Sequence, residues 1–174
     1  ELLKHISKGK LLDIGCGEGK DALIFAKKGL EVTGVDISKV AINRFLKEAK
    51  LRKIKVKVVV SKIENYQINK KYDVIVCNYL LHFLKKSTAL KIIKKMQINT
   101  KDNGVNVVSG FRAKPPFYNK KTKSYYFLKH NELLNLYKGW KILMYIKGLS
   151  RTRAKDKKGN LLKQETAIIV AQKK

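Results

Sequence analysis

A glycine-rich segment between a predicted strand and a predicted helix constrains the fold of this chain more than any other feature. The apolar run from Lys10 to Ile14 predicts the strand, and the helical pattern begins after Gly19. Glycine lets a ligand approach the backbone closely because it has no side chain. A dinucleotide site of the Gly-x-Gly-x-x-Gly type that starts at Gly15 would need glycine at position 20. Lys20 stands there, so the segment does not match a dinucleotide site.

The charges beside the glycines also argue against a phosphate ligand. Asp13 and Glu18 flank the segment, and two carboxylates would repel the phosphate that a helix N-terminus otherwise attracts. A ligand with an ammonium and a sulfonium suits these carboxylates, and S-adenosylmethionine carries both. Asp36 ends the next predicted strand, where a carboxylate can accept hydrogen bonds from both ribose hydroxyls. Without these neighbours, the glycines would indicate only a tight strand-to-helix turn.

Strand and helix patterns alternate through the first two thirds of the chain, which predicts an α/β fold with a parallel sheet and right-handed crossovers. The last two strands are expected to form an antiparallel hairpin around a loop at 151–160. No linker divides the chain, so residues 1–174 are predicted to be a single domain. The predicted strands cover 10–14, 30–35, 55–60, 72–77, 104–109, 140–146 and 165–171. The predicted helices cover 20–28, 38–51 with Ser38 as N-cap, 85–97, and 130–137 with Asn131 as candidate cap.

A net charge of +27, from 40 Lys and Arg against 13 Asp and Glu, dominates the composition. Such a charge attracts polyanions such as RNA. Arginine, which nucleic-acid readers favour for bidentate contacts, is scarce, and the lysines are spread through nearly every segment. A general lysine enrichment of solvated surfaces is therefore favoured over dedicated RNA binding, which stays open as the alternative.

Several classes of protein are not indicated by the sequence. No apolar run approaches the roughly 18 to 20 residues that span a bilayer, and no leader pattern opens the chain. Cys16 and Cys77 have neither the number nor the spacing of a disulfide scaffold or a zinc site. We therefore expect a cytoplasmic protein without a membrane anchor or a metal ion.

Three motifs carry a resemblance to a known superfamily. Leu11 to Gly19 resembles motif I of class I S-adenosylmethionine-dependent methyltransferases, and Val35 to Ser38 resembles the segment that holds the ribose. Tyr72 to Asn78 is similar to the fourth motif. Within the superfamily, Phe127 to Trp140 and the last strand resemble the tellurite-resistance methyltransferase family. The resemblance implies a Rossmann-like, mostly parallel seven-stranded sheet with an antiparallel C-terminal strand, helices on both faces, and S-adenosyl-L-methionine as cofactor.

The resemblance also implies a set of cofactor-binding residues at the carboxyl ends of the strands. Family members often have an acidic residue near the adenine, and Ser61 stands at the matching position here. Asn78 can hold the ammonium of the cofactor or act as a turn cap. Cys16 lacks a visible base partner, so packing under the cofactor is favoured over a nucleophilic role. The expected cofactor-binding residues are Asp13, Gly15, Cys16, Gly17, Gly19, Asp36, Ile37, Ser61, Lys62, Ile63 and Asn78.

The methyl acceptor is less well defined by the sequence. The family resemblance implies a small soft nucleophile, such as a reduced tellurite- or selenite-type chalcogen oxyanion or a thiol-like acceptor. A soft anion needs no general base, and Arg153 or Arg112 can position it. A protonated acceptor needs a base, for which His82 is the candidate, and the alternative is that the loop from Leu80 to Leu84 simply lines the cofactor. Phe111, Arg112, Tyr126 and Phe127 are expected to line the acceptor pocket. The alternatives are an RNA methyltransferase and a non-catalytic protein of the same fold that binds a nucleic-acid or protein partner.

Overall fold

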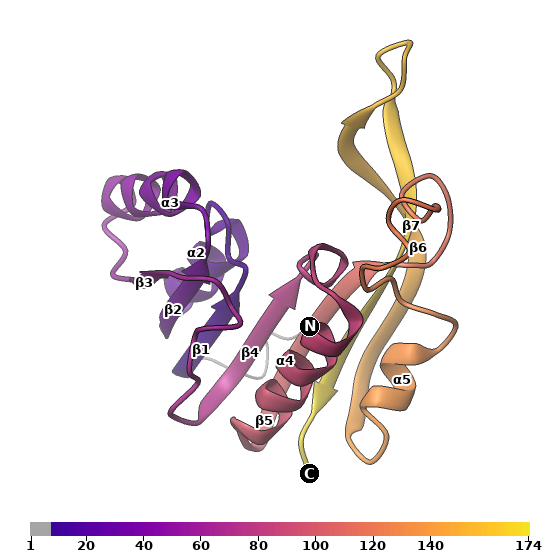
Figure 1. Ribbon diagram of the computed structural model, residues 1–174. Helices are drawn as coiled ribbons and strands as arrows, with labels where there is room; N and C mark the ends of the chain where they lie inside the picture. The colour runs from indigo at the N-terminus through magenta and orange to yellow at the C-terminus, as the bar shows by residue number, and fades with distance from the viewer. Residues whose placement is uncertain (1–7) are drawn as a thin grey trace.

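The computed structural model describes residues 8–174, with the exception of the Arg153 side chain, and its centre is one seven-stranded sheet. Figure 1 shows the sheet with helices against it. The strand order is β3-β2-β1-β4-β5-β7-β6, which confirms the predicted seven strands. The strands are β1 (Gly9–Ile14), β2 (Leu30–Asp36), β3 (Lys57–Val60), β4 (Tyr72–Asn78), β5 (Thr100–Phe111), β6 (Lys141–Lys155) and β7 (Leu161–Gln172).

Strands β3, β2, β1, β4 and β5 run parallel, and β7 lies antiparallel between β5 and β6. The helices are α2 (Lys20–Lys27), α3 (Lys39–Leu51), α4 (Lys86–Ile98) and α5 (Glu132–Leu136), with a short 3-10 helix η1 (Leu81–Phe83). Both the mixed sheet and the antiparallel C-terminal hairpin were expected from the pattern of the sequence. The chain order reverses between β1 and β4, and ligands of open α/β sheets bind at such a switch point.

Helices cover both faces of the sheet. Successive residues of a strand point to opposite faces, and in the parallel strands the residues on both faces are apolar. Leu11 of β1 packs in one buried cluster with Leu23 of α2 and Phe45 of α3. Leu12, its neighbour, packs in the other cluster with Ile93 of α4. The alternation along one strand thus assigns α2 and α3 to one face and α4 to the other, in agreement with the prediction of helices on both faces.

The local signals for two helix ends are confirmed. The Ser38 Oγ accepts a hydrogen bond from the Ala41 backbone N–H at 3.2 Å, which caps α3. Helix α2 ends before Gly29, whose φ of 98° is a left-handed value that glycine adopts readily. Asn131, in contrast, precedes α5 with φ of 52° and forms no side-chain cap, so the predicted capping role is wrong.

Strand lengths differ from the prediction at the C-terminal end. The prediction of a loop at 151–160 is wrong for the first half of that segment. Strand β6 continues to Lys155 and pairs there with β7, beyond the ends of the other strands. In Figure 1 this hairpin projects past the rest of the sheet. Asp156 closes its tip by accepting hydrogen bonds from the Lys158 and Asn160 backbone N–H groups. Cross-strand pairing therefore overrides the polar, loop-like composition of the segment.

The described part of the chain also bears on the expectations for membrane spans, cysteines and metal-binding groups. None of the helices described within residues 8–174 is long and apolar enough to cross a membrane. Cys16 and Cys77 are free thiols. The described residues contain no group of three or more His, Cys, Asp or Glu side chains arranged to hold a metal ion.

Candidate cofactor and acceptor site

The glycine segment forms a tight turn from β1 into α2 at the carboxyl edge of the sheet. Gly15, Gly17 and Gly19 have φ values of 72°, 53° and 74°, all in the left-handed region that favours glycine. A Cβ at Gly19 would lie 2.2 Å from the ring of Phe45, so this glycine is needed for packing. A Cβ at Gly17 would meet no atom within 4 Å, so the space above Gly17 is open to a ligand.

The Asp36 carboxylate is held in place beside this turn by two backbone groups. Its Oδ2 accepts a hydrogen bond from the Gly17 N–H, and its Oδ1 accepts one from the Ser38 N–H, both at 2.8 Å. Each carboxylate oxygen has a further lone pair, so Asp36 can still accept two hydrogen bonds from a diol. The geometry therefore fits the ribose-binding role that the sequence suggested.

A hollow of about 250 Å³ lies on one side of Gly15, next to Asp36. Its lining includes Ile37, Ser61, Lys62 and Ile63, which the sequence predicted to bind the cofactor. Five further lining residues were not among those expected to bind the cofactor, namely Val35, Glu64, Leu80, Phe83 and Leu84. The apolar members suit an adenine ring, and Glu64 supplies an acidic group close to the position where Ser61 replaces one. The only signal for Glu64 in the sequence is its place three residues after Ser61.

A second hollow, of about 440 Å³, lies on the other side of Gly15. Asp13, Cys16 and Asn78 line it as expected, together with Asp21, which the sequence analysis missed. The Asn78 amide donates a hydrogen bond to the Asp21 carboxylate at 2.8 Å and accepts one from the Ser109 hydroxyl at 3.0 Å. Asn78 thus positions Asp21 instead of serving as a turn cap.

Three acidic side chains, those of Asp13, Glu18 and Asp21, line this second hollow together with Lys20. Asp13 is 3% exposed, and burial, together with the charges of Asp21 and Asp36, raises its pKa from 3.8 to about 8. A cation bound among these groups would relieve both their mutual repulsion and the cost of burying charge. An acidic hollow, an open glycine backbone and an apolar hollow beyond Asp36 therefore fit the ammonium, ribose and adenine of S-adenosylmethionine.

The Cys16 side chain lines the second hollow but is closely packed and is a poor candidate for a nucleophile. Its Sγ and the Phe45 ring fill the space that a Cβ at Gly34 would occupy. Burial and the neighbouring carboxylates of Asp13 and Asp36 raise the pKa of the thiol, so the reactive thiolate is disfavoured. Both observations support packing as the role of Cys16.

An aromatic cluster follows the carboxyl ends of β4 and β5. The His82 ring stacks on Phe111 with centroids 4.0 Å apart and planes 8° apart, and Phe127 lies 6.2 Å from His82. Burial lowers the pKa of His82 to about 4, so the imidazole is neutral near pH 7. Its Nδ1 is buried and has no hydrogen-bond partner among the described residues.

The other residues predicted to bind the methyl acceptor differ in how free their side chains are to contact it. The Arg112 guanidinium forms an ion pair with the Glu165 carboxylate, so its charge is already partnered. Tyr126 and Phe127 are 2% and 7% exposed and pack largely inside the protein. Arg153 belongs to β6, and its side chain lies outside the described part of the structure. Acceptor binding by these residues stays a prediction.

Comparison with known proteins decides the family. The model of the family described as tellurite resistance protein TehB matches residues 1–170. The chain belongs to the TehB family. A probable S-adenosyl-L-methionine-dependent methyltransferase TehB from Haemophilus influenzae is 31% identical over 172 residues, which cover 98% of this chain and 59% of the relative. The chain thus spans less than two thirds of the length of that relative.

Solved structures agree with this family assignment. The crystal structure of TehB from Haemophilus influenzae superposes with a TM-score of 0.88 at 27% identity, over 99% of this chain and 60% of that one. The N-methyltransferase NodS from Bradyrhizobium japonicum, solved with S-adenosyl-L-homocysteine, has a TM-score of 0.74 at 14% identity, over 99% and 84% of the two chains. At that identity the second likeness supports the fold only, which is the predicted class I methyltransferase fold.

Proposed function

We propose that this chain transfers a methyl group from S-adenosyl-L-methionine to a small, soft nucleophile, in the cytoplasm. The observation that carries the proposal is the acidic hollow beside Gly17, where Asp13 and Asp21 face the space that a cationic cofactor would fill. Family membership supports the same activity, because the curated relative is named as a probable methyltransferase that uses this cofactor.

Each part of the site has a role in this proposal. Asp36 holds the ribose, and the hollow that contains Ser61 and Glu64 holds the adenine. Asp13 and Asp21 hold the ammonium, with Asn78 as the residue that positions Asp21. When bound, the cofactor supplies an electrophilic methyl group on a sulfonium. The protein contributes orientation and the exclusion of water.

The environment of His82 favours an acceptor that is already nucleophilic. With a pKa of about 4, the neutral imidazole is a weak base and would not readily remove a proton from a hydroxyl or an ammonium group. A thiolate or a reduced chalcogen anion needs no such base. The cofactor would supply the methyl group, with a neutral thioether as the leaving group once the acceptor's lone pair bonds to the methyl carbon, so the protein would need to remove no proton.

The test separates cofactor binding from the choice of acceptor. Calorimetry should detect binding of S-adenosylmethionine to the chain, and Asp36→Asn should weaken it by about tenfold or more. Asp102→Asn is the matched control, because Asp102 has a side chain that is 84% exposed and lies outside both hollows. Absence of binding to the unaltered chain would reject the activity as a whole.

The acceptor is tested with methyl-labelled cofactor. Small thiols, selenite and tellurite with a thiol reductant, and total RNA are offered in parallel, and labelled products are measured in solution, in the gas phase and in RNA. Transfer to a thiol or chalcogen acceptor is expected. Transfer to RNA alone would overturn the small-molecule assignment, whereas cofactor binding without transfer to any acceptor would favour a non-catalytic role.

A further inference from the structure

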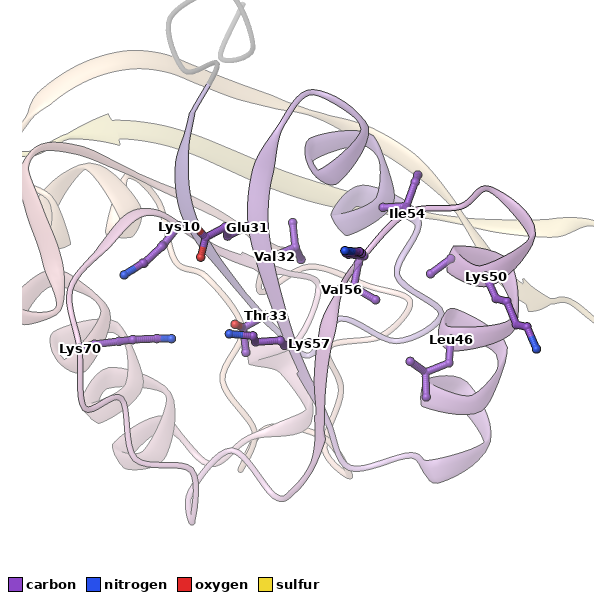
Figure 2. Close-up of a pocket in the computed structure, with 12 residues that line it drawn as sticks. Lys10, Glu31, Val32, Thr33, Leu46, Lys50, Ile54, Val56, Lys57 and Lys70 are labelled. Carbon is purple, nitrogen blue, oxygen red and sulfur yellow. The ribbon is translucent and has the colours of Figure 1, made fainter.

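A third hollow lies at the opposite end of the parallel strands from the glycine turn. It has a volume of about 490 Å³, within the range of small-molecule sites, and is bordered by the beginnings of β1, β2 and β3 and by the second half of α3 (Figure 2). Lys10 and Glu31, near the beginnings of β1 and β2, line it, whereas Gly15 and Asp36 mark the opposite ends of these strands. The hollow is therefore separate from the proposed cofactor site.

One half of this pocket is strongly cationic. Figure 2 shows Lys57 of β3 and Lys70 of the segment before β4 extending their ammonium groups toward one another, with Lys10 of β1 close by. None of these three ammonium groups forms an ion pair with another residue in the described part of the chain. Lys70 also lies over the ring of Tyr72, with its Nζ 5.4 Å from the ring centroid, but this contact supplies no anionic charge. Like charges that converge without an anionic partner repel one another, and a bound anion would remove that repulsion.

The other half of the pocket has an apolar floor, although Lys50 and Lys55 also line the pocket. Val32 and Ala49 are each 2% exposed and form its floor, and Leu46, Ile54 and Val56 complete it. Figure 2 shows Leu46 and Ile54 on the side of β3 that faces α3, away from Lys10 and Lys70. A neighbouring hollow of about 430 Å³ shares Glu31, Ile54 and Lys55 with this pocket and gives an extended ligand further room.

The charge balance favours an anionic occupant over a second copy of the chain. Five lysines line the pocket against a single glutamate, Glu31, among the lining residues described. Contact between identical surfaces of two copies would bring the lysines of one copy against those of the other. Nucleic acid is recognised through phosphates and base edges, neither of which needs a concave apolar floor.

We infer that this pocket binds an amphipathic monoanion, a fatty-acid-like carboxylate whose head lies among Lys10, Lys57 and Lys70 and whose aliphatic chain covers Val32 and Ala49. The lysines of the pocket suit the anionic head of this ligand, and the apolar floor suits its aliphatic chain. Burial of the aliphatic chain supplies affinity, and the lysines select the sign of the head group.

The experiment is calorimetry of the whole chain with decanoate below its micelle concentration. Acetate offers the head without the chain, and decyltrimethylammonium offers the same chain with the opposite charge. Decanoate is expected to bind at least about tenfold more tightly than either. Comparable binding of acetate would overturn the apolar half of the proposal, and comparable binding of decyltrimethylammonium would overturn the cationic half.

Two variants distinguish the pocket from general attraction to a basic protein. The double variant K57E/K70E is expected to lose about tenfold or more in decanoate affinity, whereas K91E/K94E makes the same charge change on the exposed side of α4 and should change the affinity by less than about twofold. Equal losses in both would overturn the proposal. L46Q, at a residue that is 42% exposed, should weaken decanoate binding with little effect on folding, and unchanged affinity would also overturn it.

Discussion

Asp13→Asn is expected to stabilise the ligand-free protein while it weakens cofactor binding. Asp13 is almost completely buried, and the carboxylates of Asp21 and Asp36 lie near enough to raise its pKa further. Asparagine has nearly the same shape and carries no charge at any pH. The substitution therefore removes the cost of ionising this position and leaves the packing almost unchanged.

The size of the effect follows from the pKa of Asp13. In the folded chain Asp13 keeps its proton up to about pH 8, whereas in the unfolded chain it loses the proton above about pH 3.8. The folded state binds more protons between these two values, so the free energy of unfolding falls as pH rises across this window. Each pKa unit corresponds to about 1.4 kcal/mol, so up to about 4 kcal/mol is lost by pH 7.

Urea denaturation of the wild type and the variant from about pH 4 to pH 9 measures this difference. The variant should be more stable by roughly 1 to 4 kcal/mol at pH 7, and the difference should vanish toward pH 4. Asp102→Asn, at an exposed position, should follow the wild type at every pH. A difference between the Asp13 variant and the wild type that stays constant across this range would refute the reasoning.

Cofactor binding provides the complementary measurement. A bound ammonium group favours the ionised form of Asp13, so binding of S-adenosylmethionine near pH 7 should release protons. Calorimetry in two buffers with different ionisation enthalpies detects that release as a difference in apparent heat. The release should disappear in Asp13→Asn, whose affinity should be lower by about tenfold or more. Equal proton release in the wild type and the variant would contradict the role assigned to Asp13.

Other substitutions test the remaining parts of the site. Gly19→Ala should cost about 3 kcal/mol or more in thermal denaturation, because its Cβ would overlap an aromatic ring, whereas Gly17→Ala should cost only about 1 kcal/mol but block the cofactor. The His82 ring signals in NMR should not titrate between about pH 6 and 8, since its pKa is about 4, and a midpoint in that range would contradict its burial. A double-mutant cycle with Arg112→Met and Glu165→Gln should give a coupling of about 1 to 2 kcal/mol in denaturant unfolding, and a coupling near zero would show that the pair is only a surface contact.

Features that depend on local spacing could be predicted from the sequence. The glycine turn, the Ser38 cap and the alternation of strands and helices each involve residues a few positions apart, so backbone preferences and periodicity are sufficient to identify them. Asp36 could be placed for the same reason, because the carboxyl end of one parallel strand lies beside that of its neighbour.

Features that depend on contacts between distant segments required the tertiary structure. Asn78 and Asp21 are 57 positions apart, and their hydrogen bond could not be inferred from either neighbourhood alone. The length of β6 was missed because its polar residues are held by pairing with β7, which overrides their preference for a loop. The third hollow, lined by Lys10, Lys57 and Lys70, could not be predicted either, because nothing in the sequence distinguishes these lysines from the many others. The sequence by itself determined the fold class and the cofactor turn, whereas long-range packing decided which charges converge and therefore which ligands each hollow can accept.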